Sequence, residues 1–192
     1  MENTSKLEKL IRDGIFLAAS RTYGEQYIEP LIRSHFNLSE PKGNDYDAID
    51  RSGKKFEIKA SKVLKQTGNM DKKKSIVDRI IFENDNLPTN RLVSFHNSGK
   101  SDYGANIQNV KRDHFEELFY VLLFEDCMKV FKVHHSKISS IPNWSDKHGR
   151  YDQLGKSGQF AVNKSNIEWH LEKCLVETFT YKYATEVYNK IK

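Results

Sequence analysis

A carboxylate and an amine lie two residues apart in a segment whose other positions are apolar. In Phe56-Glu57-Ile58-Lys59-Ala60, apolar and polar residues alternate, which predicts a strand with Glu57 and Lys59 on one face. Before it, Arg51-Ser52-Gly53 predicts a three-residue hairpin turn whose last position requires positive φ. Counting across this turn pairs residue 50 with residue 54. Asp47 is therefore predicted to lie opposite Glu57, on the same face as Lys59.

This pairing places two carboxylates close together. Directly paired side chains have Cβ atoms roughly 5 Å apart, and two carboxylates at that distance repel unless a cation or a proton lies between them. Magnesium prefers oxygen ligands and usually takes one or two carboxylates together with water and substrate phosphate oxygens. Asp47 and Glu57 are the predicted ligands, and the Ile58 carbonyl is a candidate third.

Lys59 is predicted to reach the same space, where it could orient or deprotonate water or stabilise charge on a phosphate. The pattern favours metal-assisted phosphodiester hydrolysis. The structural alternative is a surface hairpin in which Lys59 forms a salt bridge with a carboxylate.

Residues 44–50 and 53–61 resemble the core of the PD-(D/E)xK nuclease superfamily and, among its members, type II restriction endonucleases. In this resemblance, Asp47 corresponds to the metal-binding aspartate, and Glu57 and Lys59 correspond to the acid and the lysine. Tyr46 stands where the family usually has proline, so Asp45 is an alternative metal ligand. The hairpin register favours Asp47.

The resemblance implies a Mg²⁺-dependent enzyme that cuts both strands of double-stranded DNA at a short sequence and uses no organic cofactor. Cutting at a palindrome requires two symmetric sites, which predicts a homodimer. Members often carry a further acid on the preceding helix. Glu25 is the candidate for a catalytic role because it shares a helical face with Ile28 and Ile32, and Glu29 is the alternative. Two other functions remain open: a structure-selective nuclease such as a junction resolvase or a repair enzyme, and a DNA-binding protein without activity.

Contacts to DNA are expected from basic and amide side chains. A lysine-rich stretch follows the hairpin and contributes Lys62 and Lys65. Base edges are read by Arg, Lys, Asn and Gln, and two polar segments, 97–112 and 143–159, supply such residues. The candidates are Asn106, Gln108, Arg112, Arg150 and Gln153. The histidines at 134, 135 and 148 lack metal-ligand spacing, so they are expected in loops or facing DNA.

The elements that would position these residues follow from periodicity. Residues 5–36 predict a helix with a break at Gly24 and a second part that begins near Pro30. The run 118–124 predicts a strand buried on both faces, which returns through 128–133. The other expectations are a hairpin of 46–50 with 54–61, a loop and short helix in 62–90, a short strand at 91–95, irregular segments at 96–112 and 134–159, and one or two helices in 165–191. Together they predict an α/β fold with a central mixed β-sheet flanked by helices, like a restriction-endonuclease core, in a single domain over 1–192.

Bulk composition agrees with this class of protein. Hydrophobic residues make up 38% and charged residues 30%, which excludes a disordered chain. A formal net charge of +5 is compatible with a polyanionic partner. The two cysteines provide neither a disulfide framework nor zinc spacing. No apolar segment approaches the length of a membrane span and no secretory signal is present, so a cytoplasmic protein without membrane partners is expected.

Overall fold

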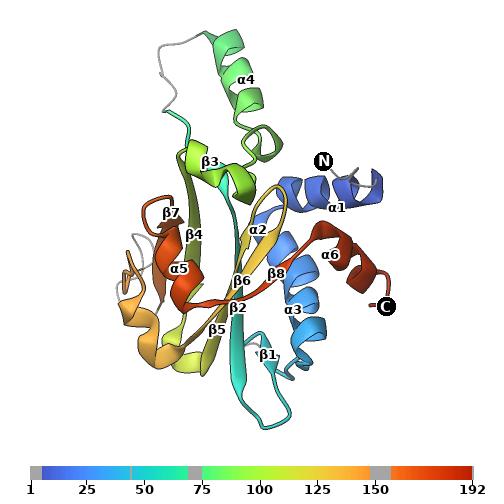
Figure 1. Ribbon diagram of the computed structural model, residues 1–192, viewed down its shortest axis with the longest axis vertical. Helices are drawn as coiled ribbons and strands as arrows, with labels where there is room; N and C mark the ends of the chain where they lie inside the picture. Colours follow the sequence, from blue (N-terminus) through green and yellow to red (C-terminus); the bar gives the residue numbers. More distant parts are fainter. Residues whose placement is uncertain (1–5, 44, 69–74, 148–156, 192) are drawn as a thin grey trace.

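The computed structural model describes residues 6–43, 45–68, 75–147 and 157–191. A mixed five-stranded sheet has the order β1-β2-β5-β6-β8, and a smaller antiparallel sheet has the order β3-β4-β7 (Figure 1). In the large sheet, only β2 and β5 pair in parallel. The strands are β1 (Ala48–Ile49), β2 (Lys55–Lys62), β3 (Leu64–Lys65), β4 (Tyr103–Val110), β5 (Glu117–Leu123), β6 (Met128–His134), β7 (Gly158–Asn163) and β8 (Leu175–Phe179). The predicted α/β class with a mixed central sheet is confirmed.

Helices cover one face of the large sheet. The α-helices are α1 (Lys6–Leu17), α2 (Ser20–Thr22), α3 (Glu29–Phe36), α4 (Ile76–Asp85), α5 (Ile167–Lys173) and α6 (Tyr181–Tyr188). A π-helical segment, η1 (Tyr23–Ile28), joins α2 to α3. The 3₁₀ segments are η2 (Pro88–Asn90), η3 (Phe95–Lys100), η4 (Arg112–His114) and η5 (His135–Ser140). No helix in the described ranges combines the length and the apolar character needed to cross a bilayer.

The central strand β5 contributes side chains to two cores because alternate residues face opposite sides. Phe119, Val121 and Leu123 pack with α1, α3 and α6, whereas Leu118, Tyr120 and Leu122 pack against the smaller sheet. All seven residues of β5 are buried, as the apolar run that begins at Leu118 predicts. The large sheet is thus covered by helices on one face and by the smaller sheet with α5 on the other (Figure 1).

The hairpin that carries the candidate residues forms with the predicted register. Ala48 pairs with Phe56 and Ile49 pairs with Lys55. Gly53 has φ of 89°, the positive value that the turn requires. The first strand is shorter than predicted, two residues rather than residues 46–50. Because β1 begins only at Ala48, most of β2 has no antiparallel neighbour.

Other predicted elements were partly wrong. The N-terminal helix breaks after Leu17 and not at Gly24, which lies inside the π-helical segment. Strand β4 lies in a region predicted to be irregular and β8 in one predicted to be helical, and β7 begins at the end of the second segment predicted to be irregular. The expected strand over 91–95 is reduced to an isolated bridge from Leu92 to Leu64. The second helix does begin near Pro30, and the short helix predicted in 62–90 is α4.

Candidate active site

A cleft of about 700 Å³ opens at the start of β1, beyond which the edge of β2 is uncovered. One wall is built from α2, η1 and the start of α3, and the other wall is built from β4. The cleft therefore lies between the helical layer and the smaller sheet. Among the residues that line it are Glu25, Glu29, Asp47, Ile58, Lys59, Lys62, Asn106, Gln108 and Asn109.

Asp47 and Lys59 line this cleft, and the buried Glu57, which is not among the lining residues, meets them through Lys59. The Lys59 ammonium lies 3.4 Å from Asp47 Oδ2 and forms an ion pair with Glu57 Oε1. The Ile58 N–H donates to Asp47 Oδ2 at 2.8 Å, which fixes the aspartate beside the strand edge. The structure thus brings together the three residues that the hairpin register predicted, with a positive charge between the two carboxylates.

Burial governs the electrostatics of this cluster. Glu57 is only 5% exposed, and burial raises the pKa of its carboxyl although the Lys59 ammonium opposes the rise. Burial alone would lower the pKa of the Lys59 amine, but the carboxylates of Glu57 and Asp47 outweigh it and raise that pKa. Lys59 is therefore protonated at neutral pH in this state. It is placed to stabilise negative charge rather than to accept a proton.

The backbone of β2 adds an oxygen to the cleft. Alternate residues of a strand direct their N–H and C=O groups to opposite edges. Phe56 C=O accepts from Asp47 N–H, and Ile58 N–H donates to Asp47, so the carbonyl of Ile58 faces the same open edge. The side chain of Ile58 is buried in the core, yet Ile58 lines the cleft. Its backbone is the part that can serve a ligand there.

Arg33 and Glu29 support this arrangement from α3. Arg33 Nη1 donates to the carbonyl of Asp47 at 3.1 Å and to Glu29 Oε2 at 3.2 Å. Glu29 is 14% exposed, and its pKa is raised to about 7, first by burial and then by the charge of Asp47. Glu29 thus belongs electrostatically to the Asp47 cluster.

Glu25, the predicted additional acid, also lines the cleft. Its side chain is 53% exposed and accepts a hydrogen bond from the exposed Arg21 at 2.8 Å. Of the two acids, Glu29 is the one whose carboxylate is shielded from solvent and coupled to Asp47. The sequence named Glu29 as an alternative, but Arg33 carried no signal because its contacts depend on the hairpin docking against α3.

Lys62 has a structural task in addition to its position in the cleft. Its amine donates to the carbonyls of Phe16 at 2.8 Å and Ala18 at 2.6 Å, at the C-terminal end of α1. It also lies 4.6 Å from the centre of the Tyr23 ring, whose hydroxyl donates to the carbonyl of Ala60. These contacts fix α1 and η1 to the uncovered edge of β2, so they position the wall of the cleft.

The other predicted DNA-contacting residues lie in the cleft, away from the cleft, or outside the described residues. Asn106 and Gln108 lie on the cleft-lining part of β4 beside Asn109, which has φ of 57° at a β-bulge. Lys65 is exposed but outside the cleft lining. Arg112 lies away from the cleft, where it pairs with Asp146 and donates to Ser139. The candidates Arg150 and Gln153, and His148, lie outside the described residues.

The chemistry of the donor set fits a hard divalent cation such as Mg²⁺. Two carboxylates contact the same ammonium, that of Lys59, which offsets one of their two negative charges, and the carbonyl of Ile58 is directed to the same edge of β2. Within the described ranges, no group of three or more His, Cys, Asp or Glu side chains is arranged to hold a metal ion. A bound magnesium ion would therefore need water and substrate oxygens to complete its shell, as is usual for this ion.

The shielded Glu29 predicts a pH dependence of stability. Its pKa of about 7 exceeds the ordinary value of 4.5, so the folded state binds the proton more tightly than the unfolded state. Its stabilising contribution is present below pH 4.5 and is lost as the pH rises through 7, by at most about 3 kcal/mol. Between pH 5 and pH 8 the unfolding free energy of Glu29→Gln is expected to decrease less than that of wild type. The measurement is denaturant titration at each pH.

Glu25→Gln is the matched control, since its side chain is more than half exposed. It should retain the wild-type pH profile. An identical pH profile for Glu29→Gln and wild type would contradict the shielding of Glu29.

Comparison of the sequence with protein-family models and with curated proteins finds no match.

Proposed function

We propose that the protein is a magnesium-dependent endonuclease that hydrolyses phosphodiester bonds in double-stranded DNA at a short specific sequence, as type II restriction endonucleases of the PD-(D/E)xK superfamily do. The observation that carries the proposal is the meeting of Asp47 and Glu57 at Lys59 beside the open edge of β2, where Asp47 and Lys59 line a cleft. The mixed sheet, flanked by helices, agrees with the fold that this superfamily implies.

The residues of the cleft have distinct roles in this proposal. Asp47 and Glu57 would hold Mg²⁺ together with the carbonyl of Ile58. When bound, the ion supplies an activated water and neutralises charge on the reacting phosphate. Lys59 is protonated and would stabilise the negative charge that grows on the phosphate oxygens. Arg33 is a positioning residue, because it holds the backbone of Asp47 and the carboxylate of Glu29 without lying in the metal set.

The cleft also offers neutral groups for contacts with DNA. Asn106, Gln108 and Asn109 line it, and their side chains make no hydrogen bond to the described part of the chain. Free carboxamides can form paired hydrogen bonds with adenine edges. In this proposal these residues would contact bases of DNA bound in the cleft.

The test is digestion of a fully sequenced plasmid and of linear duplex DNA, each with Mg²⁺ and with EDTA. We expect discrete bands that require Mg²⁺ and map to one short sequence. Cutting confined to branched or damaged DNA would instead identify a structure-selective nuclease. Salt-sensitive binding without cleavage in Mg²⁺ or Mn²⁺ would identify a DNA-binding protein and overturn the proposal.

A further inference from the structure

A second polar pocket, of about 360 Å³, lies where β8 leaves the edge of β6. Its walls are η5 and α5, and its floor is the end of β6. It shares no lining residue with the candidate active-site cleft. The cleft lies beside β2, whereas this pocket lies beside β6, and β5 separates the two strands. Pockets for small ligands have volumes of about 300–1,000 Å³, so this pocket has room for one.

The end of β6 offers an unpaired backbone N–H to this pocket. Phe131 is the last residue of β6 that pairs with β8, and the N–H of Lys132 donates to the carbonyl of Cys174 at 2.8 Å. Alternate residues of a strand direct their N–H groups to the same edge, so the N–H of His134 faces the side on which no described strand pairs with it. This N–H has no hydrogen-bond partner in the described part of the chain. It is therefore a donor for solvent or for a ligand.

Two lysines supply positive charge. Lys137 on η5 and Lys173 on α5 line the pocket, and neither forms an ion pair with the described residues. Burial raises the pKa of the Cys174 thiol, while a hydrogen bond with Tyr120 and the charge of Lys137 oppose the rise. The Lys137 ammonium thus acts on a residue that itself lines the pocket. Of the described residues that line the pocket, none is an Asp or a Glu, so both charges are available to an anion.

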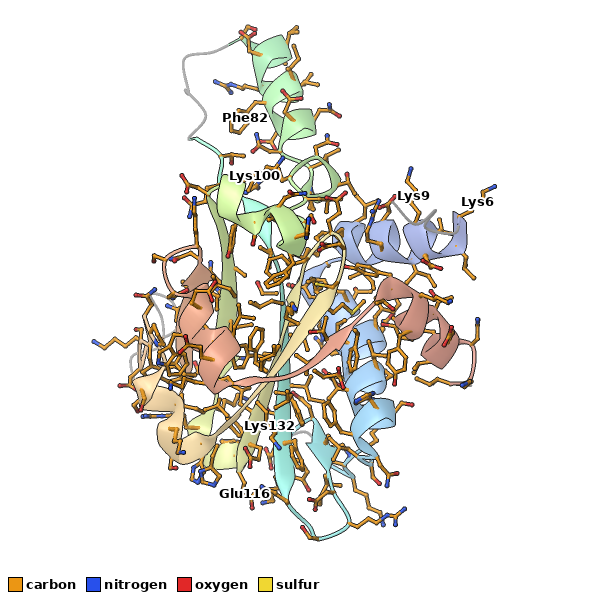
Figure 2. All side chains as sticks on the ribbon, in the orientation of Figure 1. Lys6, Lys9, Phe82, Lys100, Glu116 and Lys132 are labelled. Carbon is orange, nitrogen blue, oxygen red and sulfur yellow. The ribbon has the colours of Figure 1, made fainter. Side chains whose placement is uncertain are left out.

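Lys132 also lines the pocket but directs its charge elsewhere. Its amine lies 6.0 Å from the centre of the Phe119 ring, and Phe119 packs on the helix-covered face of the large sheet. Figure 2 shows Lys132 over the large sheet, away from α5. The positive charge of the pocket therefore comes from its two walls, through Lys137 and Lys173.

Trp169 adds an aromatic surface beside these charges. It lies four residues before Lys173 on α5, so the two side chains share one side of the helix, and both line the pocket. The indole ring packs against the core but stays partly exposed, and its N–H makes no hydrogen bond within the described part of the chain. Ser140 contributes a hydroxyl from the opposite wall. The pocket thus combines a planar ring with two ammonium groups and several hydrogen-bond donors.

This combination of groups selects a chemical class of ligand. Lysines, hydroxyls and backbone N–H groups bind phosphate oxygens, and aromatic side chains stack on nucleobases. A simple anion would leave the indole without a contact, and an apolar ligand would leave two ammonium groups unpaired. A ligand that carries both a phosphate and a planar base uses all of them.

We propose that this pocket binds a nucleotide, with its phosphate held by Lys137, Lys173 and the N–H of His134 and its base against Trp169. The nucleotide is either free or the 5′-phosphorylated end of a nucleic acid strand, since both present the same groups. The proposal does not depend on nuclease activity, because the pocket and the cleft have no lining residue in common.

The first test is isothermal titration calorimetry with adenosine monophosphate (AMP) in EDTA, which prevents metal-dependent hydrolysis. We expect binding that weakens as the salt concentration rises. Adenosine and inorganic phosphate should each bind roughly tenfold more weakly than AMP, because each lacks one of the two groups that the pocket recognises. Absence of AMP binding, or inorganic phosphate that binds as tightly as AMP, would overturn the proposal.

Variants locate the bound AMP. Lys137→Gln and Lys173→Gln should each weaken AMP binding by roughly tenfold, the effect of one lost charge-assisted hydrogen bond. Trp169→Leu should weaken AMP binding but leave the binding of inorganic phosphate unchanged, which also shows that the variant is folded. Lys182→Gln on α6 is the matched control, since Lys182 is exposed and outside the pocket, and it should bind AMP like wild type. Unchanged AMP affinity in both pocket-lysine variants would place AMP elsewhere and overturn the proposal.

A short single-stranded oligonucleotide identifies the source of the nucleotide. It is titrated in EDTA with and without a 5′-phosphate, and the affinities are compared with that of AMP. Tighter binding of the phosphorylated strand than of AMP, weakened by Lys137→Gln, would support a strand end as the ligand. Tighter binding of AMP would support a free nucleotide. A strand without the 5′-phosphate that binds as tightly as the phosphorylated strand and more tightly than AMP would contradict the role of the phosphate and overturn the proposal.

Discussion

Replacing Asp47 with Asn or Glu57 with Gln is expected to slow DNA cleavage by roughly a thousandfold. Each change removes one of the two carboxylates that pair with Lys59, while it keeps the size and shape of the side chain. Loss of several kcal/mol of charge stabilisation at the phosphate accounts for a change of this size. The measurement is the single-turnover cleavage rate of duplex DNA at saturating Mg²⁺.

Slower cleavage shows a catalytic role only if the variants still fold and still bind DNA. Both variants should bind the same DNA in fluorescence anisotropy at least as tightly as wild type, because each removes a negative charge that repels phosphate. Glu172→Gln on α5 is the matched control, since Glu172 is exposed and lies outside the cleft lining. It should cleave at the wild-type rate. Wild-type cleavage by Glu57→Gln would remove the basis of the nuclease proposal.

The hairpin and its three candidate residues could be predicted because the information is local. A three-residue turn ending in Gly53 sets the register, and the register decides which side chains share a face. The buried strand β5 was equally visible, since an unbroken apolar run needs no partner to be recognised. These are elements in which sequence pattern and tertiary environment agree.

Strands β4 and β8 could not be predicted because their pairing is not encoded locally. Alternation in β4 is interrupted by Gly104 and by the bulge at Asn109, and its polar residues face the cleft rather than bulk solvent. Strand β8 joins α5 and α6 directly, so its five residues read as part of a long helical segment. Strand β8 is an edge strand that forms because β6 offers it a free edge, which the sequence does not reveal.

The contacts of the site that could not be predicted from the sequence are also contacts between segments far apart in the chain. Arg33 reaches Asp47 only when the hairpin docks beside α3, and Lys62 reaches α1 only when β2 lies beneath it. Lys62 was predicted from charge as a DNA contact, whereas its amine donates to two helix carbonyls. A charged residue can thus satisfy backbone groups at a helix end while it lines a candidate active-site cleft, and its residue type alone does not separate the two roles.

Replacing Lys59 with Met is expected to separate metal binding from catalysis. The ammonium lies between Asp47 and Glu57, in the space where a divalent cation would balance the same charges. Without it, the two carboxylates repel each other in a shielded position, and the unfolding free energy of the metal-free protein should fall by about 2 kcal/mol. This estimate is below the cost of breaking a fully buried pair because the Lys59 side chain is 23% exposed.

Magnesium should compensate for this loss. A ligand that binds the folded state raises its stability according to its concentration and affinity. In Lys59→Met the ion no longer displaces a competing ammonium, so Mg²⁺ should raise the melting temperature more than it does in wild type. Cleavage should nevertheless be lost, because the charge that stabilises the reacting phosphate is gone.

Lys62→Met provides the contrast on the same strand. It removes two hydrogen bonds to α1, so it should lower the melting temperature without any added response to Mg²⁺. The double variant Lys59→Met/Glu57→Gln should also lose the enhanced response, since one of the two repelling charges is gone. Equal Mg²⁺-dependent shifts in wild type and Lys59→Met would mean that the amine does not occupy the cation's space. The carboxylates would then have to bind metal elsewhere in the cleft, and the pairing of Asp47 with Glu57 would no longer explain the chemistry.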